Sequence, residues 1–122
     1  MLASKKQATS ETFNSGVLNV LRASDGIIYE TIMENVNYGN RTVGASRFFN
    51  AESAGTEVSH LIAVPFNRII KRGNILELHD FMDDETNLFE ITQIQEKYDT
   101  APACLYISLK RTSINYVDKR SN

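Results

Sequence analysis

The sequence predicts an all-β fold: a small antiparallel β-barrel of about six or seven strands with a long flexible loop. Between residues 58 and 109, four short segments alternate apolar and polar side chains, the pattern of strands that bury one face. Pro65, a Lys-Arg-Gly-Asn turn at residues 71–74, an acidic loop and Pro102 separate these segments. The 3.6-residue period of an amphipathic helix does not persist over ten residues anywhere in the chain.

Strands are predicted in seven segments. They cover residues 16–21, 27–36, 42–51, 58–64, 75–78, 88–94 and 103–109. Ser-Asp-Gly at residues 24–26 predicts a turn after the first of these, because Asp and Gly tolerate the positive φ of tight hairpins. Asn-Tyr-Gly-Asn at residues 37–40 predicts a second turn. Neither face of the strand before that turn is fully apolar, which is typical of an edge or interface strand.

The segment over residues 58–64 gives the clearest strand pattern, and that over residues 42–51 gives a weak one. In the former, His60 shares a face with apolar side chains, and Pro65 ends the strand because it has no N–H to donate. In the latter, Phe48 and Phe49 are adjacent, so one ring must point away from the core. Two adjacent phenylalanines in such a segment favour a subunit contact.

Length and composition predict one soluble, intracellular domain. The chain has 122 residues and a net charge of −2, which argues against a dedicated polyanion binder. Residues 1–12 are predicted to form a flexible N-terminal arm, residues 13–112 the β-barrel domain and residues 113–122 a C-terminal tail. No apolar run has the length of a secretory signal or the ~20 residues of a membrane span.

Cys104 is the only cysteine, which excludes an intramolecular disulfide and a cysteine-rich zinc site. Its neighbours are apolar, so it is interpreted as a small buried side chain; the alternative is a thiol nucleophile. His60 is interpreted as a structural or subunit-contact residue, with a catalytic base as the alternative.

Two charged groups stand out along the chain. The acidic group is interpreted as a solvated hairpin tip, and the alternative is a divalent-cation site, because the group has the ligand types that such an ion binds. It comprises His79, Asp80, Asp83, Asp84 and Glu85. The basic group is either a partner- or DNA-facing turn or a solvated turn. It comprises Arg68, Lys71 and Arg72.

The order of features from residue 35 to residue 111 resembles the head–tail joining proteins of tailed phages, also called head-closure, stopper or neck proteins. A loop with glycines and small residues runs from residue 38 to residue 56 and precedes an apolar strand that closes with Val-Pro-Phe at residues 64–66. The sequences Ile-Ile-Lys-Arg-Gly-Asn-Ile, Leu-Phe-Glu-Ile-Thr-Gln-Ile and Leu-Tyr-Ile-Ser-Leu-Lys then follow, beginning at residues 69, 88 and 105.

The resemblance implies a structural protein and no enzyme. Such a protein forms a homo-oligomeric ring that joins the DNA-filled head to the tail and helps close the DNA channel. Its partners are the portal-adaptor ring, the tail-completion protein and the packaged DNA, with no cofactor, metal or membrane. Such a protein is located in the host cytoplasm before assembly and in the virion neck afterwards. The runner-up functions are a small OB- or SH3-like β-barrel that binds nucleic acid or acts as an adaptor, and a tail terminator.

The family's channel loop, carried onto this chain, falls at about residues 40–56. The expected gating-loop and subunit-interface residues are Arg41, Arg47, Phe48 and Phe49. The expected partner- or DNA-facing residues are Arg68, Lys71 and Arg72. No catalytic residue is expected.

Overall fold

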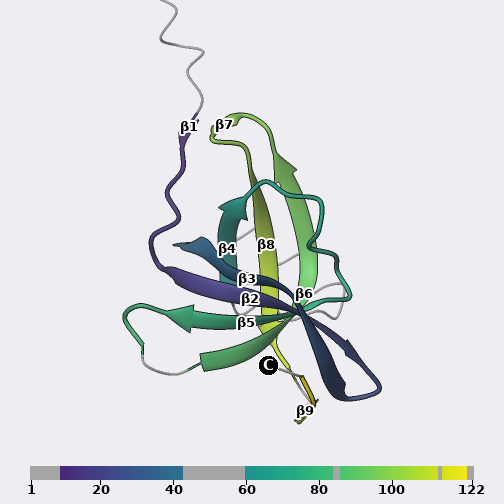
Figure 1. Ribbon diagram of the computed structural model, residues 1–122. Coiled ribbons are helices and arrows are strands. Elements are labelled where there is room, and N and C mark those ends of the chain that lie inside the picture. The colour runs from purple at the N-terminus through teal and green to yellow at the C-terminus, as the bar shows by residue number, and fades with distance from the viewer. Residues whose placement is uncertain (1–8, 43–59, 84–85, 113, 121–122) are drawn as a thin grey trace, which may run out of the picture.

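The computed structural model describes residues 9–42, 60–83, 86–112 and 114–120 (Figure 1). These residues form nine strands and no helix. The strands are β1 (Thr9–Ser10), β2 (Gly16–Ser24), β3 (Ile27–Arg41), β4 (His60–Pro65), β5 (Ile75–Asp80), β6 (Thr86–Lys97), β7 (Thr100–Ala101), β8 (Cys104–Arg111) and β9 (Val117–Asp118). None of the described residues belongs to a helix of the length and apolar character that crossing a bilayer requires.

Six of the strands pair into a ring. The order is β2-β5-β6-β8-β4-β3, and β3 pairs back with β2 to complete it. All six pairings are antiparallel. Two parallel pairs, β1 with β7 and β3 with β9, are added around this ring. The predicted small all-β fold is confirmed, as a barrel-like ring within a mixed sheet.

The interior of the ring holds the main core. Alternation places every second side chain of β2, β4, β5, β6 and β8 inside. The largest fully buried side chains include Leu18, Ile62, Leu76, Leu105, Ile107 and Leu109. Cys104 is also fully buried, which agrees with its interpretation as a small core residue.

The β2–β3 hairpin confirms one predicted turn and contradicts the other. Asp25 and Gly26 adopt positive φ angles of 53° and 76° in the connection, as expected from their residue types. The turn predicted at residues 37–40 is wrong, because β3 continues through it. Tyr38 is buried in the core and Gly39 pairs with Ala63 of β4, so core packing and a second strand partner outweigh the local turn preference.

An extra residue in β3 explains this continuation. Leu18 pairs with Val36 and Val20 pairs with Met33, so β3 has one residue more than β2 across this interval. Asn35 adopts a positive φ of 54° there and donates its backbone N–H to the Asn19 side chain. Such a bulge bends the strand and raises its twist, which lets β3 pair first with β2 and then with β4.

The ends of the chain attach to the outside of the ring. Residues 9–12 belong to the predicted arm, yet β1 pairs with β7. Residues 114–120 belong to the predicted tail, yet β9 pairs with the beginning of β3. Tyr116 packs there on a second, smaller apolar cluster formed by Leu21, Ile28 and Ile75. The sheet therefore has a small apolar surface on its outer side, covered by the C-terminal segment.

Candidate functional site

The end of the ring where β3 ends and β4 begins is fixed by a buried ion pair. The Arg41 guanidinium donates to Glu11 Oε1 from Nε at 3.1 Å and from Nη2 at 2.5 Å. The Glu11 side chain is only 4% exposed, and its Oε2 accepts a hydrogen bond from the Tyr106 hydroxyl at 3.0 Å. Arg41 also donates to the backbone carbonyls of Asn40 and Thr12. Burial lowers the pKa of Arg41, but the hydrogen bonds and charges of Glu11 and Tyr106 together outweigh it and raise that pKa.

Arg41 was expected in the gating loop and the subunit interface. In the structure, its guanidinium binds the chain's own N-terminal segment and lies 6.0 Å from the centre of the Tyr106 ring. It therefore anchors the point at which residues 42–59 leave β3. The other residues expected in that loop, Arg47, Phe48 and Phe49, lie outside the described residues.

The same end of the ring contains a cavity of about 240 Å³. It is lined by Tyr38, Asn40, His60, Leu78, Asp80, Asp83, Asn87, Phe89 and Arg111. Asp80 accepts hydrogen bonds from the Asn40 amide at 3.0 Å and from the Tyr38 hydroxyl at 3.3 Å. The His60 ring meets the Phe89 ring edge-on at 4.8 Å between centroids, and Arg111 lies over the same ring.

The protonation states of this cavity follow from its contacts. The hydrogen bond from Asn40 is the largest contribution that lowers the pKa of Asp80. Burial, and then the charge of Arg111, lowers the pKa of His60. Burial and the nearby Asp80 raise the pKa of Tyr38. At neutral pH the cavity therefore presents a carboxylate, a neutral imidazole, a phenol and a guanidinium, groups that bind polar partners through hydrogen bonds.

In the acidic group predicted at residues 79–85, His79 and Asp80 lie on opposite faces of β5, and Asp84 and Glu85 lie outside the described residues. The His79 ring lies beside Thr86 on the outer face, whereas Asp80 points to Tyr38 and Asn40 at the cavity. Adjacent residues of a strand point to opposite sides, which separates them. Among the described residues, no group of three or more His, Cys, Asp or Glu side chains is arranged to hold a metal ion.

The basic residues lie in the connection between β4 and β5, and all three are exposed. Arg68 stacks over the Phe66 ring at 5.0 Å and lies 3.7 Å from a carboxylate oxygen of Glu96. The Phe66 ring contacts the Tyr98 ring at 5.2 Å between centroids. Lys71 and Arg72 follow in the turn before β5, where the Asn74 side chain accepts the Lys71 backbone N–H at 2.7 Å. The structure thus brings Arg68 of this connection together with the half-buried Phe66 ring and, from the β6–β7 connection, the exposed Tyr98 ring.

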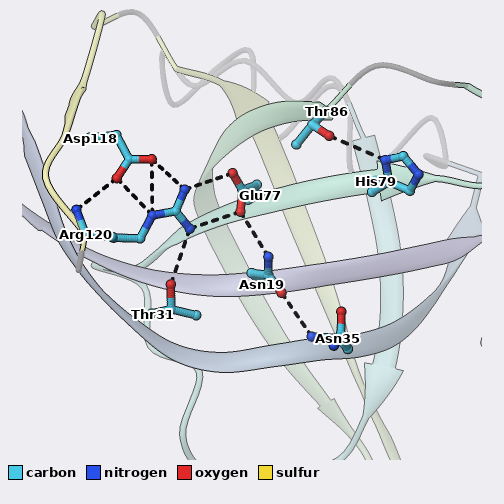
Figure 2. A network of polar contacts seen from close by, with 8 residues as sticks. All are labelled: Asn19, Thr31, Asn35, Glu77, His79, Thr86, Asp118 and Arg120. Carbon is cyan, nitrogen blue, oxygen red and sulfur yellow. Dashed lines mark hydrogen bonds and ion pairs between the residues drawn. The ribbon is translucent and has the colours of Figure 1, made fainter. Parts of the chain in front are cut away.

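A second polar network, which sequence reasoning missed, holds the C-terminal segment (Figure 2). The Arg120 guanidinium donates to both oxygens of Glu77 at 3.1 and 3.2 Å and to Asp118 at 2.6 Å. Asn19 donates to Glu77 at 3.0 Å from the neighbouring strand. Arg120 lowers the pKa of Asp118 to about 2. Burial opposes ionisation of Glu77, but the hydrogen bonds from Arg120 and Asn19 outweigh it and lower its pKa.

Comparison of the chain with family models, with curated proteins and with solved structures yields no match.

Proposed function

We propose that this protein is a structural assembly subunit of the neck of a tailed phage or prophage, which forms a ring that joins the head to the tail and helps close the DNA channel. The order of sequence features from residue 35 to residue 111 supports this proposal, together with the barrel-like fold that the resemblance implies.

One observation carries the proposal furthest. β3 and β4 are hydrogen-bonded antiparallel neighbours, yet residues 42–59 connect them. Antiparallel neighbours need only ~2–5 residues between them, and connections longer than ~12–15 residues are uncommon in compact domains, where they are binding loops, lids or linkers. This connection starts beside the Arg41–Glu11 ion pair and contains the sequence Arg-Phe-Phe at residues 47–49. A long connection whose first residue follows this ion pair is suited to contact neighbouring subunits of the ring and the DNA channel.

Replacing Phe48 and Phe49 with serine is expected to impair ring assembly more than folding of the monomer. The reason is that buried aromatic side chains supply much of the energy of an interface, so their loss should weaken association by about tenfold or more. Ring formation on a purified portal–adaptor complex, counted in electron micrographs, measures the effect.

The matched control is Tyr29→Ser, which removes an exposed aromatic ring from β3, far along the chain from the insertion. Equal loss of thermal stability and of assembly in the double variant would show that the two rings belong to the core and contradict the proposal.

A nucleic-acid-binding β-barrel is the second candidate function, and the exposure of Arg68, Lys71 and Arg72 in one connection favours it. If these residues contact phosphates, replacing all three with alanine reduces the salt dependence of single-strand binding by a slope of about 2, since each phosphate contact on a single strand contributes ~0.7. Fluorescence anisotropy of a labelled oligonucleotide between low and high salt measures this slope. The control is Arg22→Ala with Lys119→Ala, and an unchanged slope for the triple variant rejects this function.

A further inference from the structure

The connection between β4 and β5 forms a surface that is both basic and apolar. Arg68, Lys71 and Arg72 supply the positive charges. Ile69 and Tyr98 are 51% and 61% exposed beside them. We call these five residues the basic surface. Exposed aromatic and aliphatic side chains next to arginine are characteristic of protein–protein contacts.

The turn after β5 forms a smaller surface of opposite charge. Phe81 and Met82 are 57% and 93% exposed, and the exposed Asp83 follows them. The turn is held by hydrogen bonds from Met82 N to Asp80 Oδ1 at 2.9 Å and from Asp83 N to Asp80 O at 3.1 Å. Phe81, Met82 and Asp83 are called the acidic surface. Because Asp80 fixes the backbone of this turn, the backbone needs little further ordering on binding.

The β4–β5 connection, which carries the charges of the basic surface, and the turn that carries the acidic surface adjoin opposite ends of β5 (Figure 1). β5 is six residues long, so the Cα atoms at its ends are about 17 Å apart. Four of the seven large exposed hydrophobic side chains among the described residues belong to these two surfaces. A chain with two different complementary surfaces, far apart and of opposite charge, has what a head-to-tail contact between identical copies requires.

We infer that the basic surface of one copy docks on the acidic surface of the next copy. This inference rests on the ring assembly proposed above and specifies its contact. Isolated exposed ion pairs contribute little, so the apolar side chains supply most of the affinity and the charges set direction and partner choice. A single contact is weak, and closure of the ring strengthens it because each added copy is held on two sides.

Cysteine cross-linking tests the contact directly. Ile69→Cys with Met82→Cys in one chain is expected to give a ladder of disulfide-linked oligomers under mild oxidation on the portal–adaptor complex, because the contact repeats from copy to copy. Met82→Cys alone is expected to remain monomeric on a non-reducing gel, since the acidic surface does not face itself. The buried Cys104 stays in place in both. A dimer from Met82→Cys alone would show a symmetric contact and overturn the inference.

Charge reversal provides a second test of the contact. One variant carries Arg68→Glu, Lys71→Glu and Arg72→Glu, and the other carries Asp83→Lys, so that both retain the apolar side chains of the two surfaces. Each alone is expected to assemble at least tenfold less than the wild type, and an equimolar mixture is expected to recover assembly because opposite charges again meet. Both sets of residues are exposed, so the melting temperature stays unchanged and reports on the fold.

The remaining outcomes separate this inference from the proposed function. If rings form but neither reversal affects them, the head-to-tail contact is wrong and the ring proposal stands. If the wild type forms no ring on the portal–adaptor complex, both are rejected.

Discussion

Replacing Arg41 with alanine is expected to lower the free energy of unfolding by about 3–5 kcal/mol. The Glu11 carboxylate is almost fully buried and accepts two hydrogen bonds from Arg41. Without the guanidinium, the carboxylate keeps the Tyr106 hydroxyl as a partner but has no positive charge beside it, and a buried unpaired charge is strongly destabilising. Urea denaturation followed by circular dichroism measures the loss.

The matched control for this variant is Arg22→Ala. Arg22 pairs with Glu30 at 2.6 Å, but both side chains are about half exposed. Exposed pairs contribute about 0–1 kcal/mol, so the control is expected to remain near the wild type. Equal losses in the two variants would show that burial of the Arg41–Glu11 pair has no energetic consequence.

Replacing Arg120 with alanine is expected to release the C-terminal segment and to lower the free energy of unfolding by about 2–3 kcal/mol. Arg120 joins Glu77 on β5 to Asp118 on β9 through two ion pairs (Figure 2). Amide hydrogen exchange gives a local measurement. The N–H groups of Val117 and Lys119 donate to the backbone carbonyls of Gly26 and Ile28, at 2.9 and 2.8 Å. Protection of these two N–H groups from exchange is expected to disappear in the variant.

The stabilisation by Arg120 is expected to depend on pH. Both carboxylates have pKa values below their usual range, that of Asp118 at about 2. Groups with a lowered native pKa stabilise the fold above their unfolded pKa and lose that contribution as the pH falls through the native one. The difference in stability between the wild type and Arg120→Ala is therefore constant near neutral pH and shrinks between about pH 4 and about pH 2.

Lys119→Ala is the control for the C-terminal variant, because Lys119 is exposed and its backbone makes the pairing with Ile28. It is expected to retain both the protection of the segment and the pH dependence. Loss of protection at Val117 in this control would assign the attachment to Lys119 instead of Arg120.

The sequence predicted what depends on neighbouring residues and missed what depends on distant ones. The alternation of apolar and polar residues correctly predicted β5 and β8, and the residue types of Asp25 and Gly26 correctly predicted the turn between β2 and β3. Both signals are local properties of the sequence. The turn predicted at residues 37–40 was wrong, because Asn-Tyr-Gly-Asn has residue types typical of turns but the Tyr38 ring is buried in a core formed by strands elsewhere in the chain.

The same distinction explains the missed anchors. Glu11 meets Arg41 across 30 residues, and Arg120 meets Glu77 across 43. Glu11 and Arg120 lie in polar segments without periodicity. From composition alone, those segments were predicted to be a flexible arm and a tail. A partner so far along the chain leaves no local signal, so the two ion pairs that attach the termini could be found only from the three-dimensional structure.

The position of β8 has a consequence for synthesis of the chain. β8 is the last strand of the ring in sequence, and it fills the gap between β4 and β6, which do not pair with each other. Until residue 111 has left the ribosome, a nascent chain exposes the backbone edges of both neighbours, and unpaired edges are where chains aggregate. Premature termination before β8 is therefore expected to give an open sheet with two unpaired edges, which aggregates and does not form a shorter stable domain.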